Sequence, residues 1–337
     1  EDDLSNSPEV SPTVTPTNAP TPTEELWEDI TMVFAGDIYM SNYIVNNYNS
    51  NGIDGVLSKE LQSEFEFANI AMVNQEFAFS NRGVKADDKQ FTFRVDPSYV
   101  ALFKDMNLDI VTLANNHSMD FGTEALVDSF DTLKNANIEY VGAGNNLEEA
   151  KETKYFDVNN KKIAVLAASR VIPVPDWNAT RSKPGLLTTY DPTNLIAEIK
   201  TAREQSDFVV VYVHWGLEKH STPEAYQRSL AKQYIDAGAD LVIGSHPHVL
   251  QGIEYYNGKP IIYSLGNFMF YNSIDRTAVL KVIMNEANEI SVQLIPCKAD
   301  NAQTHQLVDT LSKSKFYQYM EDISYDIELD DNGFVVE

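Results

Sequence analysis

The stretch IVTLANNHSMDFG, residues 110–122, decides the fold class of this chain. Its first part, Ile110–Ala114, is an apolar, β-branched run, which is typical of a strand buried on both faces. The polar residues Asn115–His117 follow where that strand ends, and a helical pattern begins at Thr123. A buried strand, a polar loop and a helix form the repeating unit of an α/β protein.

The same unit recurs on both sides of this stretch. Other apolar runs of strand length are Thr31–Ala35, Ile70–Asn74, Ile163–Ala167, Phe208–Val213, Leu241–Ile243 and Ile261–Ser264. Helical patterns are Thr123–Asn137, Pro192–Glu204 and Pro223–Ala237, and the last two open with proline, which is favoured in the first turn. Near the end of the chain, Thr277–Asn285 and Glu289–Pro296 predict an antiparallel hairpin.

The composition divides the chain into three parts. Residues 1–27 are rich in proline, threonine and acidic side chains and cannot bury a core, so we expect a disordered tether. The chain begins at Glu1 without a methionine, so this tether is expected to follow a removed targeting segment or a lipid anchor, which makes the protein extracytoplasmic. The alternative is a disordered tail on a cytoplasmic enzyme. Residues 28–300 show no break in composition and predict one large domain, and residues 301–337 predict a C-terminal extension.

Charge and cysteine content exclude several classes of protein. The net charge of −25, from 50 acidic and 25 basic side chains, disfavours binding to nucleic acid or to anionic membranes. An anionic substrate would need cations at its binding site. Cys297 is the only cysteine, so neither an intrachain disulfide nor a multi-thiolate zinc site is available. The sequence also lacks an apolar run of the roughly 18 residues that a membrane-spanning helix requires, so contact with a membrane would need an N-terminal anchor.

Polar side chains follow five of the predicted strands, at the positions where α/β proteins assemble their sites. Four of the six histidines in the chain belong to this group. Their oxygen and nitrogen donors suit Mn, Fe, Zn or Mg, and are numerous enough for two divalent ions that share a carboxylate. The group is Asp37, Glu76, Asn115, Asn116, His117, His214, His246 and His248.

The order of these motifs resembles the calcineurin-like metallophosphoesterases, and within them the CapA family of capsule and poly-γ-glutamate synthesis proteins. The motifs are GD at residues 36–37, NQE at 74–76, NNHSMDFG at 115–122, HWGLE at 214–218, GSHPHV at 244–249 and SLGNF at 264–268. The resemblance covers roughly residues 30–272. It implies a four-layer α/β/β/α sandwich, whereas the pattern of strands alone predicts only a layered α/β domain.

The resemblance also implies a role for each site residue. Asp37 and His248 would hold one metal ion, His214, His246 and Asn116 the other, and Glu76 would bridge them. His117 would act as the catalytic acid on the leaving oxygen. Residues that would support the ligands or touch the substrate are Asn115, Asp120, Glu218 and Asn267. Independently of the resemblance, Arg94 and Arg170 are candidates for contact with an anion, because basic residues are scarce and these two lie near strand ends.

Two departures from the phosphoesterase pattern concern the first metal. The first motif reads Asp37-Ile38-Tyr39, where that branch has Asp-x-His, and the bridging carboxylate is glutamate where it has aspartate. Both departures resemble the CapA family itself.

Three functions therefore stay open. The first is a metal-dependent hydrolase acting on a phosphoester or on a bond of an anionic polymer. The second is a non-catalytic assembly or export factor that binds the polymer beside membrane-bound synthase components. The third is a relic site without metal. We also expect the long segment Val171–Leu187, with three prolines and Trp177, to form a lid or a wall that contacts polymer.

Overall fold

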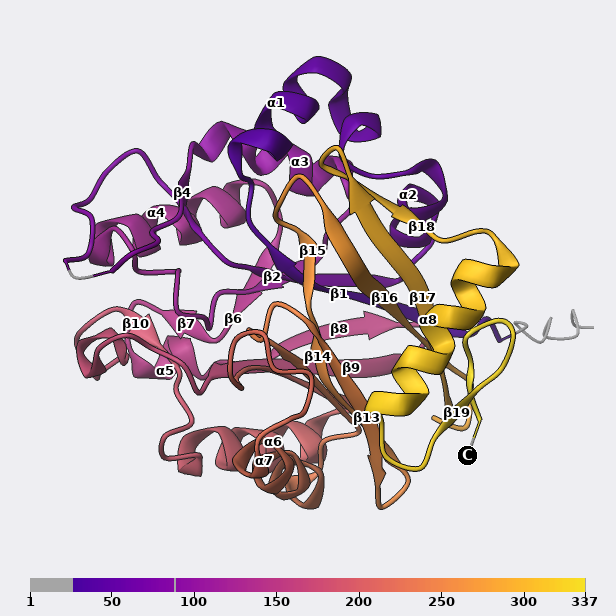
Figure 1. The fold of residues 1–337 in the computed structure, drawn as a ribbon. Helices are drawn as coiled ribbons and strands as arrows, with labels where there is room; N and C mark the ends of the chain where they lie inside the picture. Colours follow the sequence, from indigo (N-terminus) through magenta and orange to yellow (C-terminus); the bar gives the residue numbers. More distant parts are fainter. Residues whose placement is uncertain (1–26, 88, 337) are drawn as a thin grey trace, which may run out of the picture.

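The computed structural model describes residues 27–87 and 89–336 (Figure 1). The predicted tether, residues 1–27, lies outside the described residues except for Trp27. Among the described residues, no helix combines the length and apolar character needed to cross a membrane.

A large mixed sheet combines strands from the N-terminal part of the chain with strands from residues 267–306. Its strands lie in the order β18-β17-β16-β1-β2-β5-β6, with β15 beside the end of β1. β1, β2, β5 and β6 are parallel, whereas β16, β17 and β18 pair antiparallel. The bounds are β1 Ile30–Ile38, β2 Ile70–Gln75, β5 Ile110–Thr112, β6 Glu139–Val141, β15 Asn267–Met269, β16 Ile274–Met284, β17 Ile290–Asp300 and β18 Gln303–Gln306.

A second, smaller sheet has the order β13-β14-β12-β11-β9-β8. Its central strands β9, β11, β12 and β14 are parallel to one another. The bounds are β8 Lys154–Val158, β9 Lys161–Ser169, β11 Phe208–His214, β12 Leu241–Ser245, β13 Leu250–Tyr256 and β14 Lys259–Leu265. Short pairs lie outside the two sheets: β3 Ala78–Phe79 with β4 Arg94–Val95, β7 Ala143–Gly144 with β10 Gly185–Leu186, and β19 Glu328–Leu329 with β20 Val335–Val336.

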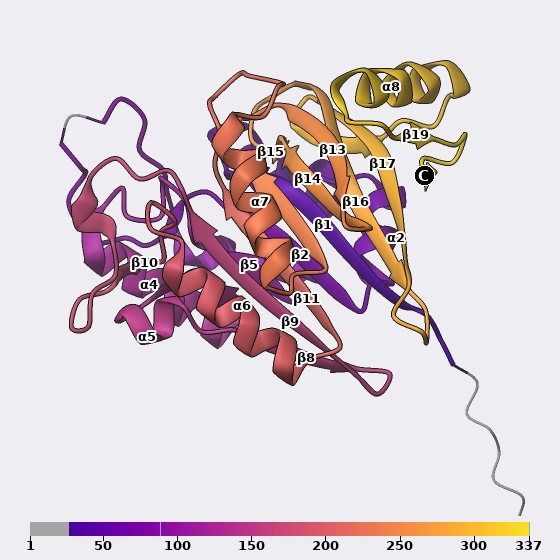
Figure 2. The ribbon, with the colours of Figure 1, turned by 90° about the horizontal axis from the view of Figure 1, so that it is seen from below.

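The two sheets pack face to face, and helices cover both outer faces (Figure 2). Successive residues of a strand point to opposite faces. Met32 and Phe34 therefore belong to the same core as Val210 of the other sheet, whereas Val33 lies in the core beneath the helices. The large sheet is covered by α1 Asn42–Asn51, α2 Lys59–Glu66, α3 Val100–Asp105 and α4 Gly122–Asn135. The small sheet is covered by α5 Leu147–Ala150, α6 Thr193–Gln205 and α7 Ala225–Ala237. The predicted four-layer α/β/β/α sandwich is confirmed.

The C-terminal segment packs against this sandwich. β18 pairs with β17, and Phe316 and Met320 of α8 (Thr310–Ile323) join the core between the sheets. α8 lies beside β13 and β17 (Figure 1).

Local hydrogen bonds explain where element ends differ from the predicted ones. β5 ends at Thr112 and not at Ala114, because the Thr112 hydroxyl accepts from the Ala114 N–H at 3.1 Å and turns the chain. α7 begins at Ala225 and not at Pro223, because Glu224 and Gln227 form a capping box there. The predicted hairpin is present as β16 and β17, each extended by several residues.

Candidate metal centre

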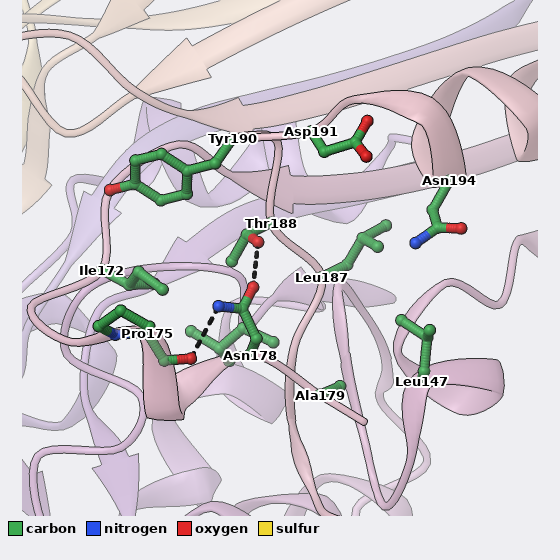
Figure 3. A pocket seen from close by; sticks show the side chains of 11 residues that line it. Leu147, Ile172, Pro175, Asn178, Ala179, Leu187, Thr188, Tyr190, Asp191 and Asn194 are labelled. Atoms are coloured by element: carbon green, nitrogen blue, oxygen red, sulfur yellow. Dashed lines mark hydrogen bonds between the residues drawn. The ribbon is translucent and has the colours of Figure 1, made fainter. Parts of the chain in front are cut away.

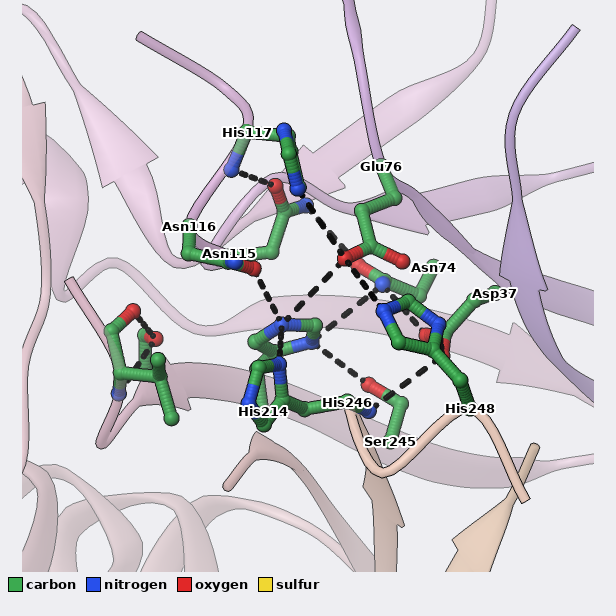
Figure 4. Close-up of polar contacts among 12 residues, drawn as sticks. Asp37, Asn74, Glu76, Asn115, Asn116, His117, His214, Ser245, His246 and His248 are labelled. Atoms are coloured by element: carbon green, nitrogen blue, oxygen red, sulfur yellow. Dashed lines mark hydrogen bonds and ion pairs between the residues drawn. The ribbon is translucent and has the colours of Figure 1, made fainter. Parts of the chain in front are cut away.

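The polar residues predicted from the sequence meet between the two sheets, at the carboxyl ends of their strands (Figure 4). Three strands of the large sheet contribute, through Asp37 in β1, Glu76 after β2, and Asn116 with His117 after β5. Two strands of the small sheet contribute, through His214 at the end of β11 and the loop 246–249 after β12. Both sheets therefore contribute residues to the site. We call this site, where the carboxyl edges of the two sheets meet, the metal seam.

Asp37 is brought into the seam by a close approach of two backbones. A Cβ on Gly36 would lie 1.9 Å from the Gly266 carbonyl oxygen, so only glycine fits there. The Asp37 N–H donates to that same oxygen at 2.9 Å, and the pairing of β1 with β2 shifts register beside it. The Asp37 carboxylate then accepts from Asn74 Nδ2 at 2.8 Å and lies 3.5 Å from His248 Nδ1.

Glu76 occupies the middle of the seam. Its side chain is fully buried, and neither carboxylate oxygen has a hydrogen-bond partner among the described residues. Three imidazole nitrogens surround its Oε1: Nε2 of His214 at 3.7 Å, of His248 at 3.9 Å and of His117 at 4.0 Å. These distances are too long for hydrogen bonds. An uncompensated buried carboxylate is costly, and this one is placed where cations would compensate it.

A second set of donor atoms converges on His214. Its Nε2 lies 2.8 Å from Asn116 Oδ1 and 3.1 Å from His246 Nδ1. Ligand atoms that bind one ion at about 2.1 Å and at right angles are about 3.0 Å apart. The spacing of these three atoms therefore fits a shared ion. Nδ1 of His214 lies 2.9 Å from Ser245 Oγ, a contact that orients the ring.

The loop that carries His246 and His248 is strained. Both residues have positive φ, 99° and 58°, which non-glycine residues rarely adopt. Nδ1 of His248 lies 2.7 Å from Asn267 Oδ1, and the His246 N–H donates to Asp37 at 3.3 Å. Such strain persists only where the surroundings impose it, and it concentrates at functional sites.

His117 is held on three sides. Its Nδ1 lies 2.6 Å from Asp120 Oδ2, which only accepts, and 3.1 Å from Lys89 Nζ, which only donates; the shorter contact favours a ring proton on Nδ1. Phe93 stacks on the imidazole with ring centroids 4.1 Å apart. Lys89 forms an ion pair with Asp120 and contacts the Asn116 carbonyl. Nε2 is left facing Glu76 and the cluster.

Burial dominates the electrostatics of the seam. It raises the pKa of Glu76 well above its usual range, and the nearby charge of Asp37 adds to this effect. Burial likewise raises the pKa of Asp37, although the neighbouring His248 opposes the change. Burial lowers the pKa values of His117 and His214, and that of His246 to about 3. The neutral imidazoles are in the protonation state that metal binding requires, whereas the raised pKa values of Glu76 and Asp37 mean that a metal ion would displace protons from these carboxyl groups.

Of the remaining predicted residues, Asn115 supports the site, whereas Glu218 and Arg94 are exposed. Asn115 supports the seam from behind, since its Nδ2 donates to Asn74 Oδ1 at 3.0 Å and to the Gln75 carbonyl at 2.7 Å. Glu218 is exposed in the loop after β11. Arg94 is also exposed, lies over the Phe121 ring at 4.1 Å and donates to the Arg82 carbonyl. None of these described contacts joins Arg94 to the histidine cluster.

Tyr39 takes the place of the histidine of the phosphoesterase motif. Its ring stacks on Phe93 with centroids 3.9 Å apart, and Phe93 in turn stacks on His117. The tyrosine thus supports the wall of the site through an aromatic stack, a role that needs no metal.

Several supporting residues were missed by sequence reasoning. Lys89 and Phe93 lie in the polar loop before β4, where no apolar periodicity marks a site. Asn74 and Ser245 belong to the quoted motifs, but the sequence did not indicate that they contact Asp37 and His214. Lys89 also lies 5.1 Å from the Trp177 ring, which connects the seam to the segment Val171–Leu187.

The donor set fits a metal. Glu76, His246 and His248 each offer one ligand atom, and these atoms lie within 4.8 Å of one another. Together with the unpartnered carboxylate of Glu76, this shows a possible ligand group for metal ions of the N- and O-binding class.

Among solved structures, the chain is similar to a hypothetical protein from Thermus thermophilus, with TM-score 0.47 and 15% identity over 79% of this chain and 99% of that one. It is also similar to the 5'-nucleotidase from Candida albicans, with TM-score 0.46 and 10% identity over 89% of this chain and 55% of that one.

Sequence comparison is more informative. Residues 31–272 match the family model described as "Bacterial capsule synthesis protein PGA_cap". The PGA biosynthesis protein CapA of Bacillus subtilis (strain 168) is 33% identical, covering 92% of this chain and 86% of the relative. The capsule biosynthesis protein CapA of Bacillus anthracis is 30% identical, covering 87% and 73%. This chain therefore belongs to the bacterial capsule synthesis family PGA_cap.

Proposed function

We propose that this protein is an accessory factor in the synthesis or export of an anionic capsule polymer, a poly-γ-glutamate, and that it acts as a metal-dependent hydrolase. The observation that carries the proposal is Glu76, a fully buried carboxylate without a hydrogen-bond partner among the described residues, surrounded by three imidazole nitrogens at 3.7–4.0 Å. The bond cleaved would be a phosphoester or a bond of the polymer. The names of its relatives support the polymer, and the seam supports the chemistry.

Two divalent ions would be held by residues from both sheets. Asp37 and His248 would bind one ion, His214, His246 and Asn116 the other, and Glu76 would bridge them. Such a pair would polarise a substrate oxygen as a Lewis acid and would lower the pKa of a bound water to about 7. In a chain of net charge −25, it would also supply the positive charge that attracts an anionic substrate.

His117 would transfer a proton at Nε2. Its Nδ1–H is directed to Asp120, and Phe93 fixes the plane of the ring, so Nε2 points at the cluster. Burial lowers the pKa of His117, so the ring is neutral near pH 7 and would first accept a proton at Nε2 before donating it to the leaving oxygen. Lys89 forms an ion pair with the same carboxylate.

The test combines metal analysis with turnover. Purified protein would be analysed for metal and assayed on a phosphomonoester, a phosphodiester and a γ-linked glutamate oligomer, with and without added Mn²⁺. We expect about two metals per chain, with His117→Ala lowering turnover on the order of 10²- to 10⁴-fold while metal content is retained. His305→Ala, a histidine that pairs with Asp300 outside the seam, is the matched control. Unchanged turnover in His117→Ala would remove its catalytic role.

Tyr39 favours a second candidate, a non-catalytic polymer-binding factor. Because residue 39 is a tyrosine, with its ring stacked on Phe93, the first ion would lack the histidine ligand of the phosphoesterase motif. A centre with one ion could still bind carboxylates without hydrolysis. In that case, oligomer binding persists in His117→Ala, disappears with a chelator, and is accompanied by no turnover of any of the three substrates.

We also propose that the protein works outside the cytoplasm, tethered to the membrane beside synthase components. The support is the proline- and threonine-rich composition of residues 1–27 and the capsule role named for its relatives. Protease treatment of intact cells that carry the full protein should degrade it. Protection in intact cells together with cleavage after lysis would contradict this location.

A further inference from the structure

Arg170 follows β9 on the opposite side of the small sheet from the metal seam. In the register of β9 and β11, Ser169 lies opposite His214, and the Arg170 N–H donates to the His214 carbonyl at 2.7 Å. The side chain of Arg170 leaves toward the helices, where it meets Tyr190 and Tyr226. The backbone therefore ties this arginine directly to a residue of the seam.

The guanidinium of Arg170 is stacked but unpaired. Its central carbon lies 4.1 Å from the centroid of the Tyr190 ring and 5.2 Å from that of Tyr226. The Tyr226 ring is itself fixed, because its hydroxyl accepts from the Gly216 N–H at 2.7 Å. Among the described residues, the guanidinium makes no ion pair, whereas Arg82, Arg203 and Arg228 each pair with a carboxylate.

The neighbouring carboxylates are occupied elsewhere. Asp191 accepts from the N–H and the hydroxyl of Thr193 at the start of α6, and Glu224 caps α7. Neither neutralises Arg170. Stacking uses the faces of the guanidinium plane and leaves its N–H edges free, which is the geometry that binds a carboxylate with two parallel hydrogen bonds.

A hollow lies beside the Arg170 side chain and could hold a ligand of the guanidinium. It has a volume of about 380 Å³ and is lined by Arg170, Thr189, Tyr190, Pro192, Ala225 and Tyr226 among others. Thr189 is 1% exposed, and its hydroxyl lies against that of Tyr234 without a hydrogen bond of normal geometry for either group. Tyr190 also borders a second hollow of about 510 Å³ beneath the segment Val171–Leu187 (Figure 3).

We propose that the Arg170 hollow is a second subsite, which binds a carboxylate of the same acidic polymer whose other groups reach the metal seam. The polymer class rests on the proposed function, whereas the hollow and its unpaired arginine do not. An extended chain with a carboxylate on every residue could cross the carboxyl edge of the small sheet and engage both places. Two-point binding of this kind would select polymers over single amino acids.

The test is binding of a fluorescent γ-linked glutamate decamer, followed by anisotropy in Mn²⁺ and in chelator. We expect Arg170→Gln to weaken binding about tenfold or more, since charge-assisted bidentate hydrogen bonds are lost. Arg170→Lys, which keeps the charge but not the planar fork, should fall between the wild type and Arg170→Gln. The matched control is Arg276→Gln, which removes an exposed arginine stacked at 4.3 Å on Tyr319 beside the other sheet. The melting temperature of each variant reports whether it is folded.

Comparing the variants in Mn²⁺ and in chelator distinguishes binding at this subsite from binding at the metal centre. Binding that depends on Arg170 but survives chelation supports the subsite and contradicts a role of the metal centre in holding the polymer. Binding lost on chelation, with Arg170→Gln equal to Arg276→Gln, overturns the subsite and leaves the metal function standing. A polyphosphate of equal length that binds as tightly and with the same dependence on Arg170 overturns the assignment to a carboxylate. No binding to the wild type in either buffer overturns both.

Discussion

Two buried glutamates of this protein are treated in opposite ways. Glu254 in β13 is 7% exposed and accepts from Arg228 Nε at 2.9 Å, Arg228 Nη2 at 2.8 Å and Tyr263 Oη at 2.7 Å, with Lys232 Nζ at 2.9 Å. Glu76 is fully buried and has no hydrogen-bond partner among the described residues. The chain neutralises one carboxylate with its own side chains and leaves the other without compensation.

The pKa values follow this difference. Burial alone would raise the pKa of Glu254, but the hydrogen bonds from Arg228, Tyr263 and Lys232 outweigh it and lower the value to about 2. Burial raises the pKa of Glu76 well above its usual range, and Asp37 reinforces the change. A buried carboxylate that is paired with side chains of the same protein, such as Glu254, stabilises the fold. A buried carboxylate without such partners, such as Glu76, is expected to bind a cation from solution.

Metal binding should separate the two glutamates most strongly. With free Mn²⁺ at 100 times its Kd, we expect the free energy of unfolding of the wild type to rise by about 2.7 kcal/mol. Glu76→Gln should abolish this gain, and Glu254→Gln should retain it. The measurement is thermal unfolding across a metal titration. An equal gain in Glu76→Gln would show that the metal binds elsewhere.

Removing the charge of Glu254 should destabilise the fold. Glu254→Gln leaves Arg228 and Lys232 without their carboxylate, and we expect a loss of about 2 kcal/mol in the free energy of unfolding. Urea denaturation in chelator measures it. Glu148→Gln, which removes an exposed partner of Lys151, is the control and should cost about 0.5 kcal/mol or less. A loss no larger than that of the control would contradict the structural role of Glu254.

Removing the charge of Glu76 should have the opposite sign without metal. Glu76→Gln replaces an unpaired buried carboxylate by a neutral amide of the same shape, and we expect a gain of about 1 kcal/mol in chelator. The same urea experiment reports it. Destabilisation by Glu76→Gln in chelator would mean that the carboxylate is compensated within the chain.

Acid unfolding should distinguish the metal seam from the Glu254 network by the pH at which each loses stability. The folded pKa of His246 is lowered from 6.5 to about 3 by burial and by the neighbouring His248, so its contribution is present above pH 6.5 and is lost as the pH falls toward 3. That of Glu254 is lost only between pH 4.5 and about 2. In chelator, Glu254→Gln should still lose stability between pH 6.5 and about 3, as His246 is protonated, but should lack the further loss between pH 4.5 and about 2. Identical curves for the variant and the wild type would contradict this.

Sequence reasoning was strongest where periodicity and motif order coincide. The apolar runs that end shortly before Asp37, Glu76 and His214 predicted both the strands and the edge at which polar groups gather. It was weakest in loops, because Lys89 and Phe93 lie in a segment without periodicity and reach His117 only through tertiary packing. Arg94 shows the reverse case, since its place near a strand end did not bring its side chain to the cluster.

By itself, the sequence determined the α/β class, the family resemblance and the list of oxygen and nitrogen donors, because apolar periodicity and residue chemistry are local properties. Only the tertiary structure decided that β1, β2 and β5 lie in one sheet and β11 and β12 in the other. It alone left Glu76 unpaired among three histidines and Arg170 stacked without a carboxylate, within the part of the chain that the structure describes. These features depend on which strands face each other across the core, and that choice is made by the packing of the whole chain.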